Sequence, residues 1–107
     1  MFTRVVEIRC KSGKTAELAR VASEQAMPIL RRQHGFQDEV VLVSNTDPNK
    51  VMAMSFWTKR EDAEQYNREQ FPRILELLHP YCDSEPTVST YEVHTSTAHH
   101  IDQSKAA

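Results

Sequence analysis

The sequence predicts an α+β fold in which four strands and two helices follow one another in the order βαββαβ. Apolar residues recur at helical spacing in two segments, and short runs rich in Val, Ile, Phe and Tyr flank those segments. The chain has 107 residues, enough for a single domain, and 39% of them are hydrophobic, so the core of one chain is small.

The first strand is predicted at residues 3–10, which contain Val5, Val6 and Ile8 before a turn at residues 11–14. A helix over residues 14–34 follows, since apolar residues recur there at steps of three and four. These are Ala16, Ala19, Ala22, Ala26, Ile29 and Leu30. Gly35 can supply a left-handed cap. Pro28 removes a backbone donor, so we expect it to kink the last turns or to separate them from the rest.

The middle of the chain predicts a β-hairpin. Apolar runs at residues 36–44 and 51–57 are joined by a short polar turn at residues 45–50. Val40 and Leu42 share one face of their strand, whereas Val41 and Val43 share the other. Both faces of this hairpin are therefore apolar.

A second helix is predicted to begin near Lys59, because Thr58 and Glu61 have the spacing of a capping box. Its buried side is marked by Ala63, Tyr66, Gln70, Ile74 and Leu77. Pro72 should divide the helix, and Pro80 should end it. A last strand at residues 88–93 completes a domain of residues 1–95, and residues 96–107 form a polar tail.

This order of elements is that of the ferredoxin-like fold, in which both helices cover one face of a four-stranded antiparallel sheet. Because the sheet is apolar on both faces, its second face also needs a cover. The most economical cover is a second copy of the chain, so we expect a homodimer. The sequence leaves open which side of the sheet meets the partner.

Charge and cysteine content narrow the class of protein. The formal net charge is -2 with basic and acidic residues interspersed, which argues against nucleic-acid or membrane partners. There is no secretion signal or apolar span, so we expect a cytoplasmic protein. Cys10 and Cys82 share no metal or redox spacing and are interpreted as buried free thiols, with a disulfide as the alternative.

Several short motifs resemble the antibiotic biosynthesis monooxygenase superfamily. They are EIRCKSGK at residues 7–14, GF at 35–36, VVL at 40–42, DP at 47–48, FWT at 56–58 and EDA at 61–63. The resemblance spans residues from about 3 to 94. It implies a dimeric α+β barrel with a pocket in each subunit between sheet and helices. Some members oxidise phenolic or quinol-like substrates with O₂ and no bound cofactor, and others degrade haem.

The chain departs from both patterns of activity. Haem-degrading members carry an Asn on the first strand and a Trp and a His on the second helix, where this chain has Glu7, Tyr66, and Leu75 or Glu76. No axial ligand remains at these positions, so we expect no haem. The resemblance to members that act with O₂ alone implies that no other cofactor is bound. Many quinol-type members carry a His near the start of the second helix and another just before a Phe in its middle, where this chain has Tyr66 and Gln70. Strand positions that hold an Asn or a Glu in other members hold Ala53 and Ser55 here.

The substrate pocket is predicted to contain Glu7, Ser55, Trp57, Tyr66, Phe71 and Leu75. Glu7 and Tyr66 are the candidates for catalysis: Glu7 as a base of raised pKa, Tyr66 as a proton donor or a holder of a substrate hydroxyl. The alternatives are structural, with Glu7 paired to Arg4, Arg9 or Arg73 and Tyr66 bonded to backbone. Trp57 is either a stacking wall or ordinary packing.

Two functions fit these residues. One is a cofactor-independent monooxygenase-like protein acting on a small aromatic or quinol-type molecule. The other is a non-catalytic dimeric module that binds a small apolar or aromatic molecule, or that only pairs with itself. No metal site is expected, since His94, His99 and His100 lie at or in a tail without fixed geometry.

Overall fold

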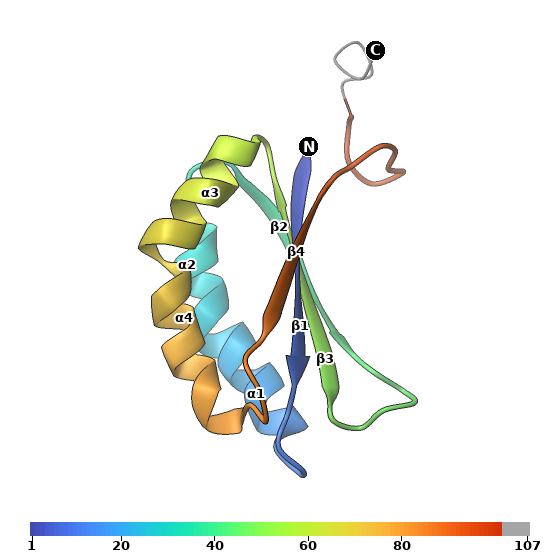
Figure 1. Cartoon of the computed structure of the whole chain (residues 1–107). Coiled ribbons are helices and arrows are strands. Elements are labelled where there is room, and N and C mark those ends of the chain that lie inside the picture. The colour runs from blue at the N-terminus through green and yellow to red at the C-terminus, as the bar shows by residue number, and fades with distance from the viewer. Residues whose placement is uncertain (102–107) are drawn as a thin grey trace.

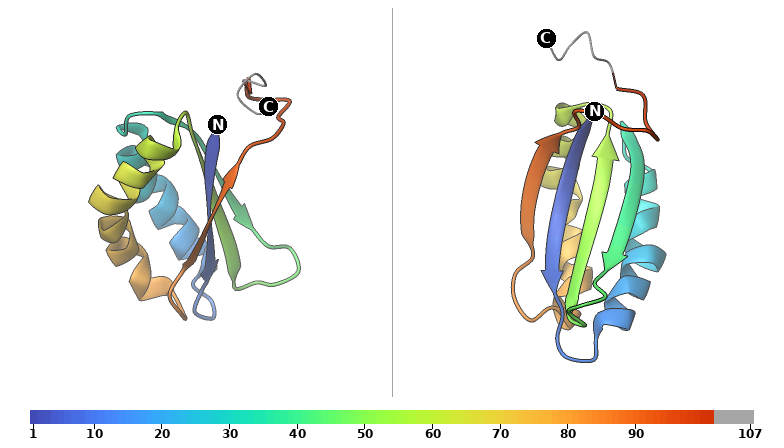
Figure 2. Two further views of the ribbon diagram at one scale, coloured as in Figure 1. Left: turned by 45° about the horizontal axis from the view of Figure 1, so that its top comes forward. Right: turned by 90° about the vertical axis from the view of Figure 1, so that its right-hand side faces the viewer.

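The structure, a computed structural model, describes residues 1–101. Its strands form one antiparallel sheet in the order β2-β3-β1-β4, and the helices lie against one face of it (Figures 1 and 2). The strands are β1 (Phe2–Arg9), β2 (Phe36–Val43), β3 (Lys50–Trp57) and β4 (Thr87–Glu92). The helices are α1 (Thr15–Val21), a π-helical turn (Ala22–Ala26), α2 (Met27–Arg31), α3 (Arg60–Glu69), α4 (Phe71–Leu78) and a 3₁₀ turn (His79–Tyr81). The predicted ferredoxin-like α+β fold is confirmed.

The first helical segment is interrupted by the π-helical turn just before Pro28. Its buried side chains include Leu18, Ala22, Ala26 and Leu30, each four residues after the last. Four residues of an α-helix turn roughly 40° beyond a full circle, so a step of four drifts around the helix. The wider π turn offsets this drift and keeps the four side chains in line. Ala16, predicted to be buried, is exposed.

The predicted caps at the end of α2 and at the start of α3 both need correction. The α2 helix ends at Arg31, and Gly35 lies in the turn before β2 with φ of 78° rather than capping the helix. The predicted capping box at Thr58 does not form, because no side chain caps α3. The Thr58 hydroxyl instead accepts a hydrogen bond of 2.5 Å from Gln37 Nε2.

The second helical segment divides as predicted at Pro72. Gln70 ends α3 and precedes α4, with Pro72 in the first turn of α4, where a missing backbone N–H is tolerated. Ala63, Tyr66, Phe71, Ile74 and Leu78 are buried beneath the two helices.

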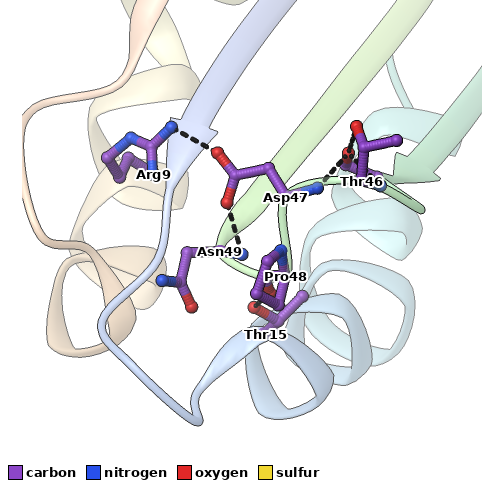
Figure 3. A network of polar contacts seen from close by, with 7 residues as sticks. Arg9, Thr15, Thr46, Asp47, Pro48 and Asn49 are labelled. Carbon is purple, nitrogen blue, oxygen red and sulfur yellow. Dashed lines mark hydrogen bonds and ion pairs between the residues drawn. The ribbon is translucent and has the colours of Figure 1, made fainter.

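The loop between β2 and β3 is fixed by polar contacts that Figure 3 shows. Arg9 Nη2 lies 2.7 Å from Asp47 Oδ2, and Asp47 Oδ1 accepts from the Asn49 backbone N–H at 3.0 Å. Thr15 Oγ1 donates to the Pro48 carbonyl at 2.6 Å. Through these contacts the β2–β3 loop is held against both the end of β1 and the first turn of α1.

Strand register divides the side chains between two faces. Phe2, Arg4, Val6 and Ile8 of β1 point toward the helices and are buried. The opposite face, called the outer face below, carries seven apolar or aromatic side chains: Val5, Val40, Leu42, Met52, Met54, Phe56 and Tyr91. No helix of residues 1–101 covers this face (Figure 2). Val41 and Val43 point toward the helices.

Candidate functional site

A cavity of about 30 Å³ lies between the sheet and the helices. Four polar residues line it: Arg4, Glu39, Ser55 and Tyr66. The rest of the wall is apolar: Val6, Ile8, Leu18, Ala22, Ala26, Leu30, Val41, Val51, Ala53, Phe71, Ile74 and Leu78. The in-line side chains of the first helical segment supply the wall opposite the sheet. A few convergent polar groups in an apolar cavity are typical of small-molecule sites.

Three of the polar residues form one row across the sheet. Ser55 of β3 pairs with Arg4 of β1 on one side and with Glu39 of β2 on the other. Glu39 reaches this row because the register of β2 shifts between Phe36 and Asp38. The shift places Phe36 and Glu39, three residues apart, on the same face, although strict alternation would separate them.

Arg4 is a buried charge, with 3% of its surface exposed. Its Nη2 donates to Asn67 Oδ1 at 2.8 Å, and its Cζ lies 5.0 Å from the Tyr66 ring centroid and 4.4 Å from that of Phe71. Burial lowers the pKa of Arg4 from its ordinary value, but a guanidinium stays charged in proteins. Within residues 1–101, no carboxylate lies within 4.0 Å of it. Buried charges are costly unless paired, so this cation favours an anion nearby.

Glu39 is the half-buried carboxyl of the cavity. Burial raises its pKa from 4.5 to about 7, while the positive charge of Arg4 acts in the opposite direction and Asp38 adds a small increase. A carboxyl with this pKa exchanges protons readily near neutral pH. It therefore has the property required of a general base.

Tyr66 lies at the centre of an aromatic cluster and is 3% exposed. Its ring centroid is 5.0 Å from Trp57 and 6.1 Å from Phe71. Burial raises the pKa of the Tyr66 hydroxyl well above its ordinary value, so at neutral pH it is a hydrogen-bond donor rather than an anion. Trp57 lies behind it, fully buried, and its Nε1 donates to Ser55 Oγ at 2.9 Å.

The structure brings together half of the residues that the sequence predicted for the pocket. Ser55, Tyr66 and Phe71 line the cavity, and Trp57 supports Tyr66 from behind. Leu75 is half-buried and is not part of the cavity wall. Glu7 is exposed on the outer face, in register with Met52 and Thr87.

Sequence reasoning missed the two charged residues of the cavity. Arg4 shares the alternation of Val6 and Ile8 and so faces the core. The alternation along this strand is the sequence signal for its inward position. Glu39 carried no comparable signal, because its orientation depends on the shift in β2.

Two other classes of site are not found in the described part of the chain. In residues 1–101, no group of three His, Cys, Asp or Glu side chains is placed to hold a metal ion. Across the same residues, no helix is long and apolar enough to cross a membrane. Cys10 and Cys82 are buried as free thiols.

Comparison with known proteins gives one family match. A family model described as antibiotic biosynthesis monooxygenase matches residues 1–100. Among curated proteins, none matches the chain at a significant level.

Solved structures share the fold. A monooxygenase from Streptomyces coelicolor in complex with the ligand nanaomycin D is 16% identical, with a TM-score of 0.77 over 89% of this chain and 88% of that one. A cofactor-independent oxygenase from Streptomyces nogalater is 17% identical, with a TM-score of 0.75 over 92% and 97%. A conserved protein from Methanosarcina mazei is 22% identical, with a TM-score of 0.70 over 85% and 91%.

Proposed function

The chain belongs to the antibiotic biosynthesis monooxygenase family, and from this premise we propose that it is a cofactor-independent monooxygenase acting on a small aromatic or quinol-type molecule. The reaction would take place at the cavity on the helix-facing side of the sheet. The observation that carries the proposal is the convergence of Arg4, Glu39 and Tyr66 on this cavity.

Each of the three residues has a role that its environment supports. Glu39, with a pKa of about 7, accepts the proton of the substrate hydroxyl. The resulting substrate anion is stabilised by the buried charge of Arg4 and by a hydrogen bond from Tyr66. The electron-rich anion then reduces O₂: one oxygen atom enters the product as a carbonyl, the other leaves as water, and the substrate CH₂ or its enol tautomer supplies all four electrons.

The size of the cavity adds a requirement. About 30 Å³ holds a molecule the size of water or dioxygen, but an aromatic ring needs several times that volume. The wall must therefore move when a ring binds. Ala22 and Ala26 belong to the π-helical turn, and such turns occur often at functional sites. We place the adjustment in this segment of the wall.

The test is oxygen uptake with a panel of phenols, naphthols and anthrones. Glu39→Gln is expected to reduce the rate by about 10²–10⁴-fold, because the amide cannot accept the proton. Glu7→Gln is the matched control, since it changes a carboxylate on the outer face and should leave the rate unchanged. No uptake by the wild-type chain, or equal rates for wild type and Glu39→Gln, would refute the proposal.

The alternative is a non-catalytic module that binds a small aromatic molecule. It is favoured by Ser55, whose hydroxyl accepts from Trp57, and by Arg4, which already donates to Asn67. Part of the polar wall thus has partners without a substrate. Compounds that raise the melting temperature in a thermal-shift screen without any oxygen uptake would support this function instead.

A further inference from the structure

A second hollow lies on the other side of Arg4, as a groove of about 230 Å³ between α3 and β4. The residues that line it include Phe2, Arg4, Arg60, Asn67, Val88 and Thr90. The engineered protein cavities that bind benzene are smaller than this, so the groove has room for a substituted aromatic ring. Arg4 borders both hollows.

The groove exists because β4 is an edge strand that the helices leave uncovered. Val88 pairs with Val6 and Thr90 pairs with Arg4, so both side chains point to the helix-facing side. All six residues of β4 are nevertheless exposed, and Val88 is 40% exposed. The views in Figure 2 show β4 at the edge of the sheet beside β1.

The walls of the groove are suited to an aromatic anion. Phe2 and Val88 provide apolar surface, and two guanidinium groups border it against the single carboxylate of Glu64. Arg60 is exposed, with its Cζ 5.7 Å from the Phe2 ring centroid and its Nε 3.4 Å from Glu64 Oε1. Arg4 contributes the buried charge behind Asn67 that lacks a carboxylate partner in residues 1–101.

We propose that this groove binds an aromatic carboxylate, with its ring on Phe2 and Val88 and its carboxylate facing Arg60 and Arg4. A planar guanidinium matches a carboxylate through two parallel hydrogen bonds, and a neutral group of the same shape would lose this charge-assisted contact. Apart from Arg4, the groove shares no lining residue with the cavity of the proposed reaction. The inference therefore holds whether or not the chain is an oxygenase.

The experiment titrates the full chain with sodium benzoate and with benzamide, its neutral counterpart, by calorimetry and by backbone amide NMR. Benzoate is expected to bind with one site per chain and about tenfold more tightly than benzamide. Amide shifts should be concentrated at residues 88–90 of β4 and 60–67 of α3. Raising the salt concentration should weaken benzoate binding and leave benzamide unaffected.

Three variants locate the site. Arg60→Gln removes the accessible charge and should weaken benzoate binding about threefold, while Thr90→Trp fills the groove and should abolish it. Arg68→Gln is the control, because Arg68 is exposed on the same helix but does not border the groove. Benzoate and benzamide binding equally, or benzoate binding that survives Thr90→Trp, would overturn the inference. Oxygen uptake with uncharged phenols should not change in Arg60→Gln, so this inference and the proposed reaction can fail separately.

Discussion

Glu39 and Arg4 face each other across Ser55, and their charges set the electrostatics of the cavity. They lie two strands apart, roughly 10 Å between backbones, so neither neutralises the other completely. Burial disfavours the charged form of both, but only the carboxyl can respond by binding a proton. The protonation state of the cavity near neutral pH is therefore the protonation state of Glu39.

The raised pKa of Glu39 predicts how stability depends on pH. The folded chain holds this proton up to a pKa of about 7, whereas the unfolded chain releases it near 4.5. The contribution of the protonated Glu39 to the free energy of unfolding is thus fully present below pH 4.5 and is lost as the pH rises through about 7. Glu39→Gln should then match wild type at pH 4 and be more stable by about 3 kcal/mol at pH 8. Urea denaturation at both values measures this, and a variant less stable than wild type at pH 8 would contradict it.

Tyr66→Phe separates a role in binding from a role in folding. The substitution keeps the ring against Trp57 and Phe71 and removes one hydroxyl, at a cost of about 0.5–1.5 kcal/mol. If Tyr66 holds a substrate oxygen, the cost should appear in ligand affinity or turnover, with the melting temperature nearly unchanged. A lowered melting temperature with intact affinity would instead assign the hydroxyl a structural role.

At the scale of elements, the positions of strands and helices were predictable from periodicity. The helix breaks near Pro28 and Pro72 were predictable because proline lacks a backbone N–H donor. The details that depend on tertiary contact were not. Thr58 has the spacing of a capping residue, but its hydroxyl accepts a hydrogen bond from Gln37 of the neighbouring strand instead of capping the helix. The shift in β2 that turns Glu39 inward is likewise absent from any local pattern, since it arises from pairing with β3. Three of the six predicted pocket residues therefore line the cavity, whereas its two charged residues were not predicted.

The two glycines form a matched pair for testing backbone conformation at element ends. Gly13 and Gly35 have φ of 76° and 78°, where an added Cβ costs about 1–2 kcal/mol. A Cβ at Gly13 would meet nothing within 4 Å, whereas at Gly35 it would overlap the Asp62 carboxylate. Gly35→Ala should accordingly destabilise the fold by clearly more than Gly13→Ala in thermal unfolding. Equal losses would show that Asp62 moves aside freely.

At the scale of the whole molecule, the outer face carries exposed apolar side chains that no helix of residues 1–101 covers. Val40 is 39% exposed, Leu42 45% and Tyr91 56%. Apolar area exposed to water costs about 25 cal/mol per Å², and monomers rarely leave such a sheet face open. His99 covers part of it, since it stacks on Phe56 at 5.3 Å and its Nε2 lies 3.6 Å from Asp38. The remainder of the expected tail, residues 102–107, lies outside the described residues.

We propose that two copies pair through this face. Light scattering should give about twice the chain mass of 12.3 kDa. Leu42→Lys places a charge on the outer face and should shift the protein to monomer. Val43→Lys is the control, because Val43 is exposed at the neighbouring position but points to the helix side. A monomeric wild type, or a dimer that survives Leu42→Lys, would exclude this interface.

The position of β1 in the sheet also has a consequence for the order in which a newly made chain can fold. This strand is translated before the other three, yet Phe2 pairs with Trp57 on one side and with Glu92 on the other. The β2–β3 hairpin can close through local contacts as soon as it emerges, but the central strand must wait for partners that are synthesised later. Contacts this distant in sequence slow folding. The nascent chain therefore holds its most buried strand without either partner until β3 has been translated.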